Sequence, residues 1–192
     1  MNTQRQQTRR TTAFASRASV VALVIFSAAV LIVATVVSYS RQRAHPLFPR
    51  GAVIDRIVVD KAARRLLVFR NGQMLKSYHV ALGEQPGGAK QQEGDMRTPE
   101  GVYQIDYRNP HSDYHLALHI SYPSPNDVAR AAARGVSAGS DIMIHGLPNG
   151  HSSMSAVYRQ KDWTAGCIAV TDEEIEELWR IAPDGTAIEI RP

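Results

Sequence analysis

The apolar run from Val20 to Val37 restricts this chain more than any other feature of its sequence. Its 18 residues include no charged residue and no proline. As an α-helix they would span about 27 Å, close to the hydrocarbon thickness of a bilayer. We expect an uncleaved membrane anchor over residues 20–37, between a tail (1–19) and a linker (38–53). The alternative is a cleavable signal peptide, but the run exceeds the usual apolar region of about 7–15 residues and no Ala-x-Ala site follows it.

The charge is distributed unequally along the chain. Residues 1–50 hold seven arginines and no acidic residue, so residues 51–192 hold 15 of the 22 basic residues against all 18 acidic ones, a net charge of −3. This later part lacks the basic surface expected of a nucleic-acid-binding protein, so we expect no nucleic-acid partner. Four arginines precede the apolar run and two follow it closely. This bias predicts a cytoplasmic N-terminal tail (1–19) and a folded domain outside the cytoplasm.

Residues 54–192 have the pattern of one mainly β domain with short helices (α+β). Asn71-Gly72 lies between two apolar stretches and predicts a type I′ hairpin within an antiparallel meander. Gly83 to Met96 holds four glycines and a proline, which predicts a loop that either borders a cleft or is an ordinary connection. Strands are expected over residues 55–60, 64–70, 73–83, 102–107, 116–121, 141–145, 167–170 and 186–191.

Two helices are expected in this domain. The first covers Ser124 to Arg134, with Ser124 near its N-cap and Gly135 just past its end. The second begins with a capping box formed by Thr171 and Glu174 and ends near residue 182. Its buried face is expected to carry Ile175, Leu178, Trp179 and Ala182.

Three histidines, His111, His115 and His119, are spaced four residues apart, which on a helix would place them on one face as a metal site. Pro110 and the alternating pattern of residues 116–121 favour strands instead. We therefore expect neither a metal site nor a cofactor.

The single cysteine of the chain, Cys167, follows Gly166 and precedes an apolar stretch, and His145 ends an apolar stretch upstream. A cysteine attacks as its thiolate, and an imidazole that takes the proton is the expected partner. The pair could meet at the same end of neighbouring strands. Gly146 would leave space beside the imidazole, and Gly166 would let the N–H of Cys167 and a neighbouring N–H form an oxyanion hole. His151 is a weaker alternative base.

Each of these residues also has a purely structural interpretation. Free cysteine is commonly a small buried hydrophobic residue, and His145 alone would be a hydrogen-bonded histidine at a strand end. Thiols in an oxidising compartment usually form disulfides, however, so a single unpaired cysteine there favours a functional role. The pair together favours a catalytic role.

These motifs resemble the L,D-transpeptidase (YkuD-like) family, whose signature is His-Gly, a spacer, and then Ser/Thr-x-Gly-Cys before an apolar residue. Here they are His145-Gly146 and Thr164 to Ile168, and a second block, Gly94 to Tyr103 (GDMRTPEGVY), resembles the upstream T-P-x-G-x-Y/F element of the family. The resemblance covers residues 54–192 and implies a sandwich-like or barrel-like β domain. It also implies that the compartment is the periplasmic side of a bacterial cytoplasmic membrane.

The resemblance assigns roles to individual residues. It implies that Cys167 is the acylated nucleophile and His145 its base, and that Gly166 and Thr164 shape the oxyanion and thiol environment. The implied substrate is the peptidoglycan stem peptide, cut between the L-centre of diaminopimelate and the following D-alanine to leave a thioester. An amine or water then takes the acyl group.

The chain departs from the family pattern at two positions: Ala169 stands where many members have Arg, and Ala165 where many have His. The GCIAV version resembles a subgroup that includes a peptidoglycan-lipoprotein amidase. Transpeptidation is the leading hypothesis, hydrolysis through the same acyl-enzyme is the alternative, and a non-catalytic wall-binding module is the third. The missing cation could be supplied by Arg97, Arg159 or Lys161.

Overall fold

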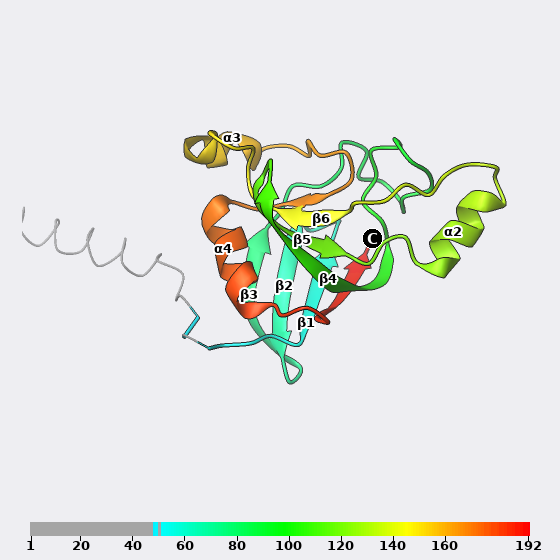
Figure 1. The fold of residues 1–192 in the computed structure, drawn as a ribbon. Helices are drawn as coiled ribbons and strands as arrows, with labels where there is room; N and C mark the ends of the chain where they lie inside the picture. The colour runs from blue at the N-terminus through cyan, green and yellow to red at the C-terminus, as the bar shows by residue number, and fades with distance from the viewer. Residues whose placement is uncertain (1–47, 50) are drawn as a thin grey trace, which may run out of the picture. The chain divides into compact units, whose positions relative to one another are not determined.

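The domain is built on one β-sheet of mixed strand direction. The computed structural model describes residues 48–49 and 51–192 (Figure 1). In this part eight strands lie in the order β3-β2-β1-β8-β4-β5-β6-β7, which confirms the mainly β fold. The strands are β1 (Arg56–Asp60), β2 (Arg65–Arg70), β3 (Gln73–His79), β4 (Gly101–Ser112), β5 (His115–Ile120), β6 (Met143–His145), β7 (Ile168–Ala169) and β8 (Ala187–Arg191).

The two edges of this sheet meet. Ala81, which follows β3, forms an antiparallel bridge with Ala169 of β7, and their N–H groups donate to each other's carbonyl at 3.0 and 2.8 Å. Gly83 forms a second bridge, with Thr164. Because β3 and β7 are the first and last strands of the sheet order, these bridges partly close the sheet on itself, as in a barrel. The contact brings the segment after β3 directly against the residues before β7.

Strand directions differ in part from the predicted meander. The β1-β2-β3 meander is antiparallel as expected, and Asn71 (φ 51°) and Gly72 (φ 77°) form its tight turn with the two positive φ angles that a type I′ turn requires. Two parallel pairs, β1 with β8 and β6 with β7, were not predicted. Sequence patterns around single strands do not show which distant strand becomes the neighbour.

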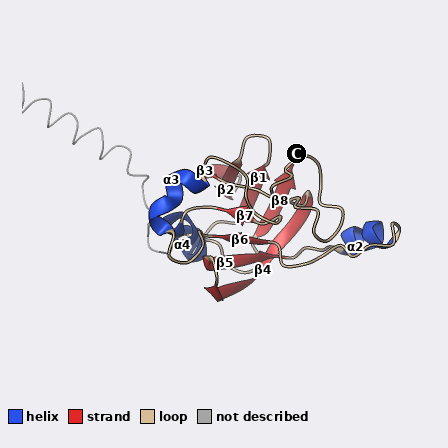
Figure 2. Ribbon diagram, turned by 90° about the horizontal axis from the view of Figure 1, so that it is seen from above, coloured by secondary structure: helices blue, strands red, loops and turns tan. Residues whose placement is uncertain are grey.

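Strand β4 is longer than the predicted 102–107 and pairs with a different neighbour on each side. Gly101 to Gln104 pair with β8, whereas Ile105 to Ser112 pair with β5. Figure 2 shows β4 and β5 lying side by side beyond the part of β4 that pairs with β8. The β4-β5 hairpin therefore extends past the body of the sheet and places its turn near β6.

Both predicted helices are present, with their caps. Helix α2 (Pro125–Ala132) begins after the capping box of Ser124 and ends two residues before the predicted Arg134. Helix α4 (Asp172–Ile181) begins after the capping box of Thr171 and packs against β5 and β6. Two short helices, η1 (Ser152–Met154) and α3 (Ser155–Tyr158), were not predicted.

The buried face of α4 differs slightly from the predicted one. Ile175, Leu178 and Ala182 are buried as expected, but Trp179 is only partly buried and Glu177 is buried with a relative exposure of 3%. The Glu177 carboxylate accepts hydrogen bonds from Lys76 and Tyr78 of β3. This ion pair explains a buried charge that the helical pattern alone could not predict.

The three spaced histidines lie on strands; the predicted strand over residues 116–121 included only His119, and the observed strands are long enough to include the other two. His111 belongs to β4, and His115 and His119 belong to β5. His115 Nε2 lies 2.9 Å from a Glu176 carboxylate oxygen, and His119 Nδ1 lies 2.6 Å from one of Asp106. The side chains of His115 and His119 thus contact different carboxylates.

The predicted anchor, residues 20–37, lies outside the described residues, as do the predicted tail and most of the predicted linker. None of the helices between residues 48 and 192 has the length and apolar character needed to cross a membrane.

Candidate active site

Strands β6 and β7 bring His145 and Cys167 to one cavity. They pair in parallel with Ile144 opposite Ile168 and His145 opposite Ala169, so Cys167, one residue before β7, lies beside Met143. His145 and Met143 are two residues apart and face the same side of the sheet. The two candidate residues therefore meet along one face of adjacent strands, whereas the sequence suggested a shared strand end.

The cavity that contains both side chains has a volume of about 310 Å³. It is lined by Glu84, Met96, Tyr114, His145, Trp163, Thr164, Ala165 and Cys167. A larger cavity of about 450 Å³ lies beside Lys61 and Pro86–Gly88 and contains neither of the two. The chemistry of the smaller cavity makes it the candidate site.

His145 is held as a neutral imidazole with its Nε2 unprotonated. Its Nδ1 lies 2.7 Å from the Gly146 carbonyl oxygen, and because a carbonyl only accepts, Nδ1 carries the proton. Burial lowers the pKa of His145 to about 4, although the Gly146 carbonyl opposes this shift. The imidazole is therefore neutral at neutral pH and can accept a proton at Nε2.

Cys167 rests as a neutral thiol. Its Sγ donates to the Asp141 carbonyl oxygen at 3.5 Å. Burial raises the pKa of this thiol and the Asp141 charge adds to the rise, whereas a backbone hydrogen bond from Met143 and the Lys90 charge oppose it. No hydrogen bond joins Cys167 to His145 among the described residues. The pair thus rests uncharged, and proton transfer to His145 has to accompany attack.

Thr164 closes the turn that carries Cys167. Its hydroxyl donates to the Cys167 carbonyl oxygen at 2.7 Å and accepts the Gly166 N–H at 3.1 Å. Thr164 lines the cavity, but its hydroxyl is engaged within the turn. The side chain therefore fixes the shape of the loop around the nucleophile.

Gly166 is required by close backbone packing. Its φ is +133°, and a Cβ at this position would lie 2.7 Å from the Arg97 carbonyl oxygen. Its N–H already donates to Thr164, so this group is not a free oxyanion donor. Within the described residues the N–H of Cys167 itself makes no hydrogen bond, which leaves it available for an oxyanion.

Gly146 serves a different purpose from the one predicted. A Cβ on Gly146 would lie 2.7 Å from Asp172 Oδ1, which accepts the Leu147 N–H at 2.8 Å. The missing side chain therefore lets the backbone pack against the start of α4 and does not leave space beside the imidazole. The Gly146 carbonyl instead orients His145.

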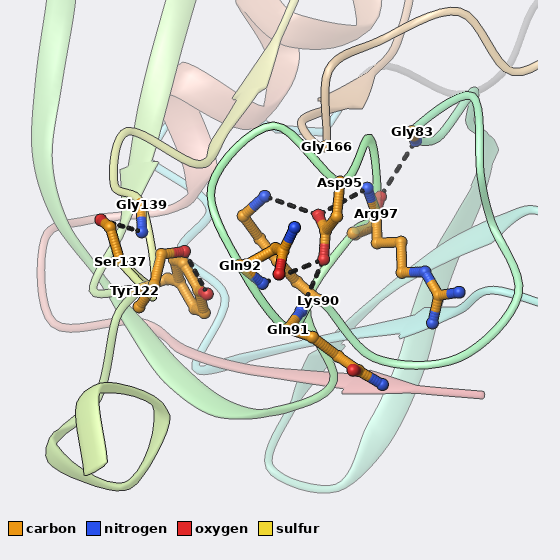
Figure 3. Close-up of polar contacts among 12 residues, drawn as sticks. Gly83, Lys90, Gln91, Gln92, Asp95, Arg97, Tyr122, Ser137, Gly139 and Gly166 are labelled. Atoms are coloured by element: carbon orange, nitrogen blue, oxygen red, sulfur yellow. Dashed lines mark hydrogen bonds and ion pairs between the residues drawn. The ribbon is translucent and has the colours of Figure 1, made fainter. Parts of the chain in front are cut away.

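Arg97 contributes to the site through its backbone. Its side chain points away from Gly166 (Figure 3), and a Cβ on Gly88 would lie 3.2 Å from a guanidinium nitrogen. Arg97 does not line the cavity. Of the other two proposed cations, Arg159 pairs with Glu174 at 2.6 Å and Lys161 lines a separate cavity. The structure brings none of the three to Cys167.

The loop from Gly83 to Thr98, here called the loop wall, is organised around Asp95. One carboxylate oxygen accepts from Lys90 Nζ at 2.9 Å and from the Arg97 N–H at 3.1 Å (Figure 3). The other accepts the N–H groups of Gln91 and Gln92 at 2.6 and 3.1 Å. Asp95 belongs to the second motif block, and its sequence context predicts no role for it.

Three rings of the cavity lining, Tyr114, His145 and Trp163, are here called the aromatic wall. The ring centroid of His145 is 4.5 Å from that of Tyr114 and 5.7 Å from that of Trp163. Tyr114 comes from the β4-β5 turn, and neither it nor Trp163 was predicted as a site residue. The alternative base His151 is exposed and bonds to the Tyr158 hydroxyl at 2.8 Å, outside the cavity lining.

The two positions where the sequence departs from the family pattern lie close to the pair. Ala165 lines the Cys167 cavity, and Ala169 is buried in β7, where it borders a smaller cavity with Trp163. Both small side chains are thus accommodated beside the site.

The profile of the L,D-transpeptidase catalytic domain (YkuD) matches residues 54–190. The chain belongs to this family. The predicted family and the extent of the predicted domain resemblance agree with this match.

Similar proteins share only part of their length with this L,D-transpeptidase-family chain. YafK of Escherichia coli (strain K12) is 30% identical over 110 residues, which is 56% of this chain and 37% of YafK. Pgp2 of Campylobacter jejuni, a helical cell shape determining protein solved as its K307A mutant, is 22% identical with a TM-score of 0.55, covering 76% of this chain and 49% of Pgp2. Bd1075 of Bdellovibrio bacteriovorus is 29% identical with a TM-score of 0.51, covering 74% and 49%.

Proposed function

We propose that this domain transfers the acyl group of a peptidoglycan stem peptide through a thioester on Cys167. The observation that carries the proposal is that Cys167 and a neutral His145, whose Nδ1 is engaged by the Gly146 carbonyl, line one cavity in an L,D-transpeptidase-family domain. The name of Pgp2 concerns cell shape, which supports a role for this chain in the cell wall.

The proposed reaction follows from the state of the two residues. The Cys167 thiol gives its proton to His145 Nε2 as the sulfur attacks the carbonyl carbon at the L-centre of diaminopimelate. The N–H of Cys167 stabilises the oxyanion. The bond to D-alanine breaks, and the leaving amine takes the proton from His145. An acceptor amine then attacks the thioester, giving its proton to His145, and the thiol is restored.

Product analysis tests the transfer. Purified domain is incubated with tetrapeptide muropeptides, and the products are separated by mass. Cross-linked dimers are expected from the wild type, and none from Cys167→Ala or His145→Gln. His151→Gln is the matched control and is expected to retain activity, because His151 lies outside the cavity lining. Wild-type activity that persists in Cys167→Ala would overturn the proposal.

Hydrolysis is the second candidate, and the solvent exposure around the site favours it. Glu84 and Ala165, which line the cavity with the thiol, are both exposed, so water can reach a thioester at Cys167. Free tripeptide without dimers, again dependent on Cys167, would identify a hydrolase. Absence of both products, together with no mass increase after incubation with a carbapenem, would identify a non-catalytic wall-binding module.

We further propose that residues 20–37 anchor the domain to the bacterial cytoplasmic membrane, with the domain on the periplasmic side. The length of the uncharged run and the flanking arginines support this. Intact mass of the membrane-extracted protein tests it. A protein that begins after residue 37 would show that the run is a cleaved signal peptide.

A further inference from the structure

The Cys167 cavity carries one uncompensated negative charge. Of its eight lining residues, Glu84 is the single carboxylate, none is Lys or Arg, and His145 is neutral because its pKa is low. The Glu84 carboxylate has no hydrogen bond or ion pair with any described residue. A ligand in this cavity therefore meets an unpaired anion.

Two of the nearby cations are engaged in ion pairs, and a third lies beside Gly88. Lys90 of the loop wall is buried and pairs with Asp95 at 2.9 Å. Arg159 pairs with Glu174, and the Arg97 guanidinium lies beside Gly88. Among the described residues none of these three cations forms an ion pair with the Glu84 carboxylate.

The backbone of Glu84 is fixed relative to the nucleophile. Its N–H donates to the Thr164 carbonyl at 3.0 Å, and Thr164 in turn bonds to the Cys167 carbonyl. The preceding Gly83 is packed so closely that a Cβ would lie 2.2 Å from the Met96 carbonyl oxygen. The carboxylate therefore projects from a rigid point on the cavity rim.

Aromatic rings complete the chemistry of the cavity. Tyr114 and Trp163, whose ring centroids are 6.0 Å apart, line it together with Glu84. Carboxylates and aromatic faces both attract alkylammonium groups, whereas both disfavour a carboxylate ligand. The lining is suited to a positively charged group.

We propose that Glu84, with Tyr114 and Trp163, forms a subsite for a primary ammonium group of the substrate peptide, which makes Glu84 a specificity-determining residue. The subsite deepens the proposed acyl transfer and rests on it. In a stem peptide the free amine at the D-centre of diaminopimelate supplies such a group, on the donor or on the acceptor strand. Glu84 binds this group and takes no part in bond breaking.

The test compares Glu84→Gln with Glu93→Gln, an exposed carboxylate of the same loop that does not line the cavity. Thioester formation is followed by mass with donor tetrapeptide whose D-centre amine is free or acetylated. For a donor-strand ammonium, Glu84→Gln lowers kcat/KM about three- to tenfold with the free amine and leaves the acetylated donor unchanged. For an acceptor-strand ammonium, thioester formation is unchanged, but aminolysis of the preformed thioester slows by a similar factor.

A probe that needs no peptide substrate separates this inference from the proposed function. Cys167 is modified with a trimethylammonium or a sulfonate alkylthiosulfonate, in which the thiolate attacks the sulfenyl sulfur and a sulfinate leaves. The wild type and Glu93→Gln are expected to favour the cationic reagent, and Glu84→Gln to lose most of that preference. An unchanged preference in Glu84→Gln, or equal losses with free and acetylated peptides, would overturn the subsite even if transfer itself is observed.

Discussion

The two walls of the Cys167 cavity are held in place by different chemistry. The loop wall is fixed by four hydrogen bonds to the Asp95 carboxylate and by backbone contacts that tolerate no side chain at Gly83 or Gly166. The aromatic wall is held by ring contacts around His145 and by one carbonyl, that of Gly146. The loop wall fixes the turn that carries Cys167, and the aromatic wall lies around His145, whose pKa depends on burial.

Because of this difference, we expect mutations in the two walls to have different effects. Errors of an ångström in the loop wall displace the Cys167 turn itself, because the Arg97 carbonyl lies directly against Gly166. The aromatic wall instead controls proton affinity through burial, so changes there act on the pKa of His145. Variants in each wall should therefore separate structural from electrostatic effects.

The largest effect is expected from Gly166→Ala. The added Cβ meets a backbone oxygen at 2.7 Å at a φ of +133°, so either the turn or the loop wall has to move. We expect a loss of about 2–4 kcal/mol in unfolding free energy and at least a hundredfold loss of thioester formation. Urea unfolding and mass-detected acylation measure both.

Two glycines serve as controls for this variant. Gly87→Ala, in the loop wall, has no atom within 4 Å of its Cβ and no left-handed φ, so stability should change little. Gly150→Ala has open space but a φ of +84°, so a loss of about 1 kcal/mol is expected from backbone strain alone. If Gly166→Ala is no worse than Gly150→Ala, the contact with Arg97 does not matter.

The burial of His145 in the aromatic wall should make the unfolding free energy of the domain fall on mild acidification. Because burial lowers the folded pKa of His145 to about 4, the unfolded chain binds more protons between about pH 6.5 and pH 4. Stability is complete above pH 6.5 and falls by about 3 kcal/mol as pH drops through this window. His145→Gln should remove most of that slope in urea titrations across pH.

The same low pKa sets the acid limb of the reaction. In the proposed mechanism Nε2 acts when unprotonated, so kcat/KM for acylation should stay level down to about pH 4 and not decline near pH 6.5. His79, whose pKa burial also lowers, is the control: His79→Gln should leave this limb unchanged. A decline of kcat/KM near pH 6.5 would show that the His145 imidazole is solvated during the reaction.

The loop wall should respond to Asp95→Asn. Burial alone would raise the pKa of Asp95, but hydrogen bonds from Gln91, Lys90 and the neighbouring backbone outweigh it and lower the pKa. The carboxylate therefore contributes stability that is present above its unfolded pKa near 3.8 and lost only as pH falls below that value. At neutral pH the variant also leaves Lys90 buried without its ion partner, at a cost of about 2 kcal/mol.

Asp113→Asn is the matched control on the other side of the cavity. Asp113 is exposed beside Tyr114, and its side chain makes no hydrogen bond or ion pair with the described residues, so no loss is expected. Equal stabilities of the two variants at neutral pH would show that Asp95 does not organise the loop wall.

Local sequence patterns predicted the elements that local chemistry decides. The Asn71-Gly72 turn, the N-cap at Ser124 and the capping box at Thr171 were found as predicted, because each depends on a few neighbouring residues. Cys167 and His145 were singled out because a thiol and an imidazole are rare residue types with few uses. The prediction that they could meet at one end of neighbouring strands differs from the structure, where they lie along one face of adjacent strands.

Contacts between distant segments could not be predicted in the same way. The parallel β6-β7 pair, the position of Glu84 on the cavity rim and the Arg97 contact with Gly166 depend on how the sheet closes. The missing side chain of Gly146 was predicted to leave space beside the His145 imidazole. In the structure it allows close packing against Asp172. Nothing in the sequence near residue 146 indicates that Asp172 lies against it.

The smallest effect is expected from Trp163→Phe in the aromatic wall. Phenylalanine keeps a ring beside His145 and Tyr158, and it removes an indole N–H that is buried without a hydrogen-bond partner among the described residues. The lost ring area and the removed polar group oppose each other, so stability should change by less than about 1 kcal/mol.

If the indole ring of Trp163 only shields the imidazole from water, acylation should slow about threefold. The acid limb of kcat/KM should then move upward from pH 4, because water gains access to His145. Trp179→Phe, on the α4 surface beside Arg108, should leave the limb in place. A limb that does not move in Trp163→Phe would assign the low pKa of His145 to the sheet beneath it and not to the aromatic wall.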